Sequence, residues 1–239
     1  PRLSFRSRIS LATTMVAASM CAFAAPATAD FETPVNFAVG TGPADLEAAD
    51  FNGDRLPDVA VANKTSNTVS VLLGSPISQF TPAVNYSTGA STGPGSITVL
   101  DIQRNGRDDV VTGNQTSGNL SQMFGNGLGA LGNAVTLTAT GGVGAVWSDD
   151  INGDPAPDLV YTNPTGATMS RRINTSGAFA AAGTTAVGSV PDGIVTQDFN
   201  RDGFVDALVA NSGSNNVSLL LNNGSGTFGV ANNFTVGTT

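Results

Sequence analysis

An acidic loop occurs four times in this chain, and an apolar run follows each copy at once. The copies begin at Asp50, Asp101, Asp150 and Asp198, so that successive copies are 51, 49 and 48 residues apart. Self-similarity at a fixed period near 50 residues is typical of repeat architectures, in which each unit stacks on its neighbours to bury its apolar faces. No other feature of the sequence limits the fold as strongly.

Short apolar runs bounded by Gly, Pro, Asn and Asp dominate the chain after residue 29, and no stretch there has the 3.6-residue periodicity of a helix. Each repeat reads as four strands. One comes early, one enters the acidic loop, one leaves it, and one follows an Asn/Ser/Thr turn; in the first repeat three of them are 35–39, 59–62 and 68–73. Four short strands per period predict an all-β fold, a β-propeller built from four-stranded antiparallel blades.

About four repeats are present. We place their units at 31–79, 80–130, 131–178 and 179–227, with a partial unit at 228–239. The partial unit echoes the beginning of the first unit, so both ends carry the same early strand rather than complementary ones. We therefore expect the repeats to be part of a larger ring, with a complete four-bladed ring as the alternative.

Residues 1–29 have the composition of a secretory signal peptide. Three arginines within residues 2–8 precede an uncharged, largely apolar stretch from 9 to 25, and a small-residue cleavage site ends at Ala29. We predict that the mature chain begins near Asp30, has no membrane span, and is secreted, whether extracellular, periplasmic or at the cell surface. A membrane anchor is the alternative interpretation of the same stretch.

The residue counts exclude several classes of function. Of ten basic residues three lie in the signal, which leaves seven against 18 acidic residues, and no basic patch for nucleic acid exists. The chain has no histidine, which removes Ser-His-Asp and Cys-His catalysis and His-ligated zinc. Most of the acids lie in or beside the four loops, where like charges repel one another unless a cation binds.

The acidic loops carry side-chain oxygens at positions 1, 3, 5 and 9, which is the pattern of a tight loop folded around one hard cation. We therefore predict Ca²⁺ as the cofactor, held by side chains and, in the fourth loop, by one backbone carbonyl. The candidate ligands are Asp50, Asn52, Asp54 and Asp58; Asp101, Gln103, Asn105 and Asp109; Asp150, Asn152, Asp154 and Asp158; and Asp198, Asn200, Asp202, Phe204 and Asp206.

Position 6 of each loop is expected to be glycine, because the chain turns sharply there. Gly106 and Gly203 meet this expectation, whereas Arg55 and Pro155 do not, and the fixed φ of proline cannot supply a positive value. Ligand charge predicts that the fourth loop binds Ca²⁺ most tightly and the second loop most weakly.

Two other interpretations of the loops are weaker. An EF-hand needs a carboxylate at position 12 and helical flanks, but position 12 is never acidic here and the flanks are strand-like. Asp and Asn also favour turns without any metal. Four loops in register, each with Asp at positions 1 and 9, favour the metal site.

The loops resemble those of the FG-GAP repeats of the integrin α-subunit propeller and the similar VCBS-type repeats of secreted bacterial proteins. The resemblance rests on the Asp-x-Asn-x-Asp-x-x-x-Asp pattern, the lead-ins at 31–35 and 80–84, and strands such as 216–221. It implies a β-propeller, typically of seven blades, with Ca²⁺ in the hairpin loops and an extracellular binding or adhesion role. Gln103, Arg55 and Pro155 depart from the family pattern.

Taken together, these features favour a secreted calcium-binding repeat protein that acts as a binding or adhesion module for an extracellular protein or glycan. In this interpretation Ca²⁺ is structural, and the chain is not an enzyme and has no catalytic residues. Two alternatives stay open: a carbohydrate-active enzyme on a propeller scaffold, and a passive spacer domain of a larger secreted protein. An enzyme would draw on the acids outside the loops, which are Asp30, Glu32, Asp45, Glu47 and Asp192.

Overall fold

The computed structural model describes residues 33–139 and 141–237. The chain divides into two compact units, Pro1–Asn36 and Phe37–Thr239, and every strand among the described residues belongs to the second. The predicted signal peptide lies outside the described residues, as do Asp30 and Glu32. In the described part of the chain, no helix is long and apolar enough to cross a membrane.

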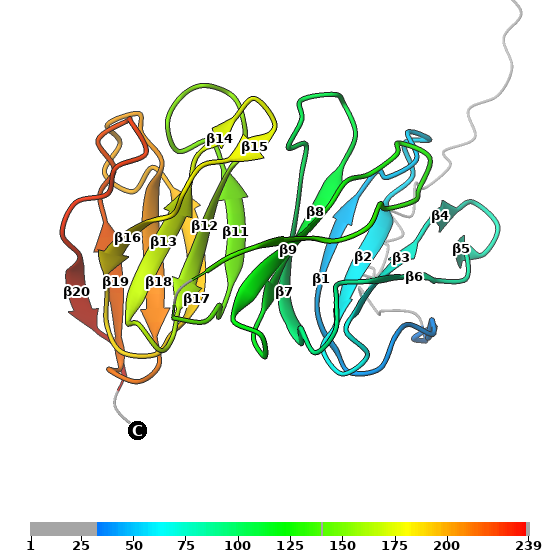
Figure 1. Ribbon diagram of the computed structural model, residues 1–239, viewed down its shortest axis with the longest axis horizontal. Coiled ribbons are helices and arrows are strands. Elements are labelled where there is room, and N and C mark those ends of the chain that lie inside the picture. The colour runs from blue at the N-terminus through cyan, green and yellow to red at the C-terminus, as the bar shows by residue number, and fades with distance from the viewer. Residues whose placement is uncertain (1–32, 140, 238–239) are drawn as a thin grey trace, which may run out of the picture. The chain divides into compact units, whose positions relative to one another are not determined.

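The second unit consists of four four-stranded antiparallel sheets, here called blades 1 to 4 (Figure 1). Blades 1 and 2 contain β1 (Pro43–Ala49), β2 (Asp58–Asn63), β3 (Thr68–Leu72) and β6 (Val84–Ser87), then β7 (Pro94–Leu100), β8 (Asp109–Asn114), β9 (Asn119–Met123) and β10 (Val135–Leu137). Blades 3 and 4 contain β11 (Val146–Asp149), β12 (Asp158–Asn163), β13 (Thr168–Arg172) and β16 (Gly183–Ala186), then β17 (Pro191–Gln197), β18 (Asp206–Asn211), β19 (Asn216–Leu220) and β20 (Asn232–Thr235). The prediction of an all-β fold with four-stranded antiparallel blades is confirmed.

The blades are offset from the repeat units drawn from the sequence. The early strand of each later repeat unit does not open a new blade. It completes the preceding blade by pairing with that blade's third strand, so that β6 pairs with β3, β16 with β13, and β20 with β19. The predicted strand at 35–39 does not form. Two short hairpins, β4 (Gly74–Ser75) with β5 (Gln79–Phe80) and β14 (Asn174–Thr175) with β15 (Ala178–Phe179), extend from blades 1 and 3.

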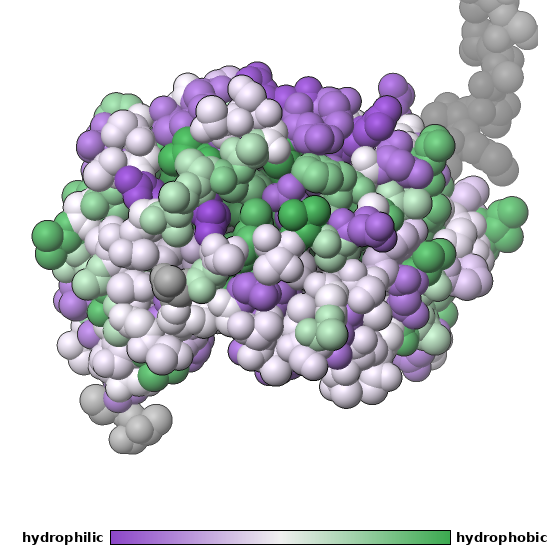
Figure 2. All heavy atoms as spheres, in the orientation of Figure 1, coloured by the Kyte–Doolittle hydropathy of each residue, from purple (hydrophilic) through white to green (hydrophobic). Residues whose placement is uncertain are grey.

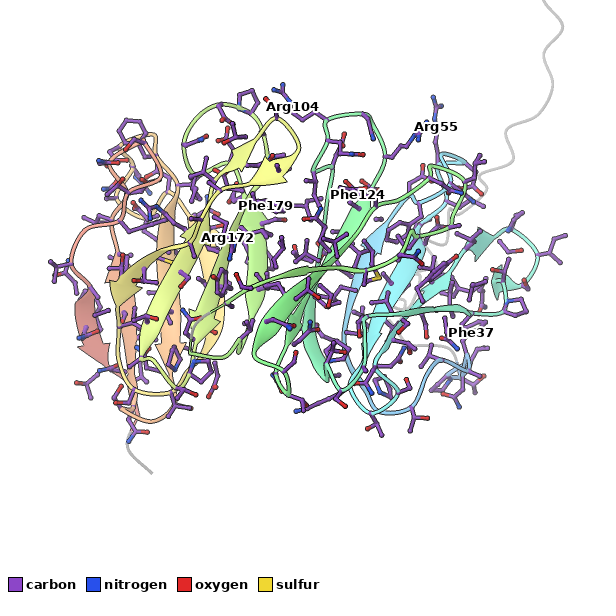
Figure 3. All side chains as sticks on the ribbon, viewed as in Figure 1. Phe37, Arg55, Arg104, Phe124, Arg172 and Phe179 are labelled. Atoms are coloured by element: carbon purple, nitrogen blue, oxygen red, sulfur yellow. The ribbon has the colours of Figure 1, made fainter. Side chains whose placement is uncertain are left out.

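Successive blades pack face to face and enclose one apolar core at each junction. The core between blades 1 and 2 contains Phe51, Ala60, Val69 and Val110. The next contains Ile102, Leu120, Leu159 and Tyr161, and the last contains Ile151, Met169, Val209 and Leu220. Phe124 and Phe179 flank the middle core from neighbouring blades (Figure 3). Because each core needs two blades, no blade buries its apolar residues alone.

The first strand of each blade lies on the same side of the unit. These inner strands, β1, β7, β11 and β17, contact one another in chain order. The described blades fan out around them rather than closing into a ring, so the alternative of a complete four-bladed ring is wrong (Figure 1). Each inner strand ends in an acidic loop, which places the loops at one edge of the blades and the β-turns at the other.

Candidate functional site

The four acidic loops lie along one edge of the blades, each joining an inner strand to the second strand. Arg55 and Arg104, from the first two loops, both project at this edge (Figure 3). The backbone N–H of Asp50 donates a 3.2 Å hydrogen bond to Asp108, so the first two loops touch. Hydrophilic residues gather along this edge of the surface (Figure 2). The structure therefore brings the predicted metal ligands into one row, blade by blade.

Each loop is wound around the carboxylate at position 1. In the first loop Asp50 accepts hydrogen bonds from the backbone N–H groups of Gly53, Asp54 and Arg55 at 2.8–3.1 Å. Asp198 does the same in the fourth loop, with Arg201, Asp202 and Gly203 as donors at 2.6–3.2 Å. The carboxylate thus fixes the loop conformation through backbone donors, as an Asx turn does.

The oxygens of positions 3 and 5 are held side by side. The amide of Asn52 donates to Asp54 Oδ2 at 2.9 Å, and that of Asn200 donates to Asp202 Oδ2 at 2.8 Å. In the second loop this hydrogen bond runs in the opposite direction, from position 5 to position 3, since the Asn105 amide donates to Gln103 Oε1 at 3.0 Å. It therefore has one carboxylate fewer at this point than the other three loops.

The backbone turns left-handed twice in every loop, at positions 4 and 6. At position 6 the φ values are 68° for Arg55, 75° for Gly106, 32° for Pro155 and 90° for Gly203. The expectation that position 6 needs a positive φ is met even where the residue is not glycine. Pro155 is far from the value near −65° that its ring favours, so the third loop carries local strain.

The carboxylate at position 9 is fully buried in all four loops. Each one accepts two backbone hydrogen bonds of 2.6–3.2 Å, one from position 2 of its own loop and one from the second residue after the end of the third strand of its blade. Asp158, for example, accepts from Ile151 and from Asn174. These aspartates tie the acidic loop to the outer part of the blade, a role that the loop pattern alone did not reveal.

Burial sets the ionisation of these aspartates. Loss of solvent raises the pKa of Asp158 to about 6, and the negative charges of Asp154 and Asp150 add to the effect. Burial also raises the pKa of Asp58 and Asp109, against the lowering effect of their backbone hydrogen bonds. A carboxylate that is costly to ionise beside other carboxylates is stabilised by a bound cation.

The donor set fits a hard cation. Positions 1, 3 and 5 each carry a side-chain oxygen, and a carboxylate at position 9 with two hydrogen bonds still has free lone pairs to offer. In the described residues, no three His, Cys, Asp or Glu side chains already converge at metal-binding distance. Ca²⁺ in the loops therefore stays a prediction.

A second polar pair lies where blades 1 and 2 meet. Asp45 and Glu47 on β1 accept the backbone N–H groups of Ile97 and Val99 at 3.0 and 2.8 Å. They satisfy donors on the free edge of β7, which has no strand partner on that side. Burial is the largest cause of the raised pKa of Glu47, and the nearby charge of Asp45 raises it further.

The opposite edge of the blades holds a hollow of about 270 Å³. Gln115 from the β8–β9 turn, Val143 and Gly144 before β11, Thr165 from the β12–β13 turn, and Asp192 on β17 line it. It therefore draws on blades 2, 3 and 4.

The hydrogen bonds of this hollow position its polar groups. The Gln115 amide accepts from Lys64 Nζ at 2.6 Å and donates to the Gly144 carbonyl at 3.3 Å. The Ser212 hydroxyl donates to one carboxylate oxygen of Asp192. Among the three described acids outside the loops, Asp192 thus lines this hollow, whereas Asp45 and Glu47 serve a blade junction.

Sequence reasoning missed one repeated pair of residues. In every blade a buried asparagine at the end of the second strand donates to a serine on the third strand, at 2.6–2.8 Å. The pairs are Asn63–Ser70, Asn114–Ser121, Asn163–Ser170 and Asn211–Ser218. The signal was present, because the asparagine and the serine follow position 9 by 5 and 12 residues in every repeat.

The loops and strands match a known repeat family. The sequence pattern of the FG-GAP-like repeat matches residues 50–112 and 150–209, which together make up more than half of the chain. The chain therefore belongs to the FG-GAP-like repeat family, as the resemblance of its loops indicated. A search of curated proteins found no match.

Solved structures with the same fold include named lactonases. The periplasmic gluconolactonase of Pseudomonas aeruginosa is 19% identical, with a TM-score of 0.62 over 80% of this chain and 53% of that one. Putative 6-phosphogluconolactonases of Bacteroides fragilis and Bacteroides uniformis are 16% and 15% identical, with TM-scores of 0.62 and 0.64 over 82% of this chain and 57% and 59% of theirs. This chain thus spans little more than half the length of these structures, and at such identities the likeness shows the fold alone.

The comparison corrects two predictions about function. The sequence favoured a calcium-binding adhesion module that is not an enzyme and kept an enzyme only as an alternative, but several of the structures that share this fold carry enzyme names. Absence of histidine removes particular catalytic groups, and it does not remove carboxylate chemistry. Of the interpretations drawn from the sequence, the enzyme on a propeller scaffold agrees best with these neighbours.

Proposed function

We propose that this chain forms part of a propeller enzyme that hydrolyses a sugar lactone in the hollow lined by Gln115, Thr165 and Asp192. One observation carries the proposal: a carboxylate and an amide from different blades face the same small cavity. The lactonase names of proteins that share this fold support the substrate class. Cavities with a few convergent polar groups are where ligands most often bind.

The residues present are suited to general-base hydrolysis. Asp192 takes a proton from water as the water oxygen adds to the lactone carbonyl carbon, and Ser212 orients the carboxylate through its hydrogen bond. The ring C–O bond then breaks, the proton passes to the ring oxygen, and an open-chain hydroxy acid remains. Lys64 donates to the Oε1 atom of Gln115 and so holds that amide in place, while the Gln115 Nε2 group, which donates one N–H to the Gly144 carbonyl, has a second N–H to offer to a substrate oxygen.

The test is acid release from D-glucono-1,5-lactone at constant pH, with the spontaneous rate subtracted. Asp192→Asn removes the base but keeps the side-chain shape, so we expect the catalysed rate to fall by about 10²-fold or more. Ser212→Ala, which removes only the orienting hydroxyl, is expected to have a smaller effect.

Asp45→Asn is the matched control, because Asp45 is another exposed inner-strand aspartate that does not line the hollow. Its rate is expected to stay near that of the unchanged protein. A wild-type rate equal to the spontaneous rate, or equal rates for Asp192→Asn and the unchanged protein, would refute the proposal.

Calcium in the acidic loops is the second part of the proposal, as a structural ion and not as a catalyst. The oxygen-only donors of positions 1, 3 and 5 support it, together with the buried carboxylate at position 9. The ion would be held by the fourth loop through Asp198, Asn200 and Asp202, and by the corresponding residues of the other loops. At about 1 mM Ca²⁺ and a Kd near 10⁻⁴ M, each site would stabilise the fold by roughly 1.4 kcal/mol.

Calorimetric titration with Ca²⁺ measures the number of sites, and a thermal melt in chelator measures their effect. We expect three or four sites and a lower melting temperature in chelator. The double variant Asp198→Asn/Asp202→Asn should lose one site and leave the remaining heats unchanged. Absence of binding heat, with no change in melting, would mean that the loops act only as turns.

A further inference from the structure

Five Asn-Gly dipeptides lie on turns of this chain, and this dipeptide is the sequence in which an asparagine most easily loses its side-chain amide without an enzyme. The reaction begins when the backbone nitrogen of the glycine attacks the asparagine Cγ atom, so it needs a glycine N–H that no acceptor already holds. Glycine favours the attack because no Cβ atom shields its nitrogen. The five asparagines are Asn52, Asn105, Asn126, Asn152 and Asn223.

Four of the five glycines donate this N–H to a side-chain oxygen. Those of the acidic loops donate to the position-1 carboxylate at 2.6–2.8 Å, and they are Gly53, Gly106 and Gly153. Gly224 donates to Asn222 Oδ1 at 3.2 Å. The N–H of Gly127 donates to no group in the described part of the chain. Only the dipeptide that begins at Asn126 therefore has a free nucleophile.

The difference between blades 2 and 4 comes from one residue. Asn126 and Asn223 occupy equivalent places after the third strands of their blades. In blade 4 the preceding residue is Asn222, whose side chain supplies the acceptor. In blade 2 it is Gly125, where a Cβ would lie 2.1 Å from the Asp108 carbonyl oxygen. This close approach of two chain segments excludes a side chain and leaves the glycine of the blade 2 dipeptide without a partner.

The side-chain carbonyl of Asn126 is held in a way that favours the same reaction. Its Oδ1 atom accepts the backbone N–H groups of Leu128 and Ala130 at 2.8 and 3.0 Å. Two such donors stabilise the negative charge that forms on this oxygen when the nitrogen attacks, as in an oxyanion hole. Arg107 lies against Gly127, where a Cβ would be 3.4 Å from its Nε atom. Its positive charge favours loss of the amide proton, and Asn126 is exposed to water.

We propose that Asn126 is a site of spontaneous deamidation in the folded protein, with water as the only co-reactant. The Gly127 nitrogen bonds to Asn126 Cγ, the bond from Cγ to Nδ2 breaks, and the proton of the glycine N–H leaves with Nδ2 as ammonia. Water then opens the resulting succinimide ring at one of its two carbonyl carbons. One opening gives aspartate at position 126, and the other gives isoaspartate, in which the backbone runs through the former side chain.

The isoaspartate product acts on the junction between blades 1 and 2. Its backbone is one methylene longer, inside a short turn that the Asn126 N–H closes by donating to the Ala130 carbonyl at 2.9 Å. In the same turn the Gly129 N–H donates to the Phe51 carbonyl of blade 1 at 2.9 Å. We expect isoaspartate to displace this contact, whereas aspartate keeps the turn and an acceptor for the Leu128 N–H.

Peptide mapping by mass spectrometry tests the site, after the folded protein has been incubated in chelator at mildly alkaline pH. Chelator removes any ion from the acidic loops, so that metal binding does not decide the rates. We expect Asn126 to convert about fivefold faster than Asn223, because the Gly224 N–H must first leave a neutral acceptor. The three loop asparagines should convert about tenfold or more slowly than Asn126, since their glycines donate to carboxylates.

Asn223 is the matched control for carbonyl activation. Its Oδ1 atom also accepts a backbone N–H, from Ser225 at 3.0 Å, so the contrast with Asn126 isolates the glycine donor. In denaturant the five sites should convert at comparable rates, because the hydrogen bonds that separate them are then absent.

The effect on the blade junction needs a second measurement. Labelling with an isoaspartyl O-methyltransferase identifies the isoaspartate fraction of the incubated protein. That fraction is expected to melt at a lower temperature than the Asn126→Asp variant, which carries the other product.

Two outcomes overturn the proposal. The first is equal conversion of Asn126 and Asn223 in the folded protein. The second is an Asn126 that folding protects as strongly as it protects the loop asparagines. Equal melting temperatures for the isoaspartate form and Asn126→Asp would refute the effect on the junction.

Discussion

The side-chain amide of Asn222 donates a 2.6 Å hydrogen bond to the backbone carbonyl of Ile151, and so joins blade 4 to the acidic loop of blade 3. The same amide donates to Val205 at 2.9 Å, and the Asn222 backbone N–H donates to Asp206. One residue thus connects its own acidic loop to the preceding one. Asn174 makes the equivalent bond to Ile102 one junction earlier.

Asn222→Ala is expected to lower the free energy of unfolding by about 1–3 kcal/mol, because it leaves a buried carbonyl without its donor at the blade 3–4 junction. Chemical denaturation measures the change. Asn232→Ala, at an exposed position of β20, is the control and should stay within about 0.5 kcal/mol of the unchanged protein. Equal effects of the two substitutions would contradict the role given to Asn222.

Asp158→Asn tests the buried carboxylate at position 9. An amide has one oxygen where the carboxylate has two, so one of the N–H groups of Ile151 and Asn174 loses its acceptor. We expect a loss of about 1–3 kcal/mol in denaturation experiments carried out in chelator. Asp154→Asn, which changes an exposed carboxylate of the same loop, should cost less. A larger loss of stability for Asp154→Asn than for Asp158→Asn would show that the buried carboxylate does not connect the acidic loop to the rest of the blade.

Pro155→Gly is expected to stabilise the protein by roughly 1–3 kcal/mol, because glycine adopts the positive φ of position 6 without strain. Glycine also restores a backbone N–H, which the equivalent residues Gly106 and Gly203 donate to the position-1 carboxylate at 2.6 and 3.0 Å.

Pro157→Gly is the control, since residue 157 does not have a positive φ. There the extra freedom of glycine in the unfolded chain should lower the melting temperature or leave it unchanged. A lower melting temperature for Pro155→Gly would contradict the assignment of strain to the third loop.

Glu47 should make stability depend on pH. Burial raises its pKa in the folded state, so the folded chain holds this proton more tightly than the unfolded chain does. The contribution of protonated Glu47 to the free energy of unfolding is therefore fully present below the ordinary glutamate pKa, and it is lost as pH rises through the raised value. Glu47→Gln stays neutral and keeps an oxygen for the N–H of Val99.

The melting temperature of Glu47→Gln, measured against the unchanged protein, is accordingly expected to rise as pH increases from 4 to 7. Asp45→Asn is the control, because it neutralises the neighbouring carboxylate on the same strand without changing the side-chain length. A constant difference between Glu47→Gln and the unchanged protein across this pH range would contradict the raised pKa.

Local sequence was sufficient for the strands and loops. Asp50 to Asp58 and its three repeats mark where each inner strand ends, because Asp, Asn and Gly favour turns and the runs after them are apolar. The second and third strands of each blade formed where the alternation predicted them. The left-handed turn expected at position 6 also formed, even at Arg55 and Pro155.

Strand pairing and burial between distant segments could not be predicted from local sequence. The strand at 84–87 completes blade 1 rather than opening the next one, since strand pairing depends on which edge is free and not on the order of the repeat. Asp58 resembled a metal ligand in the pattern, and its burial with two backbone donors appears only when Phe51 and Gly74, the second residue after β3, are in place.

The repeat period, the all-β character and the family thus followed from the amino-acid order, because they depend on spacing and on propensities within a few residues. The cavity that joins Gln115 to Asp192, and the contrast between buried Ile151 and exposed Phe199, came only from the packing of blades. Equivalent residues in a repeat have equivalent local sequence, but burial depends on what lies opposite, and that is decided by the tertiary structure.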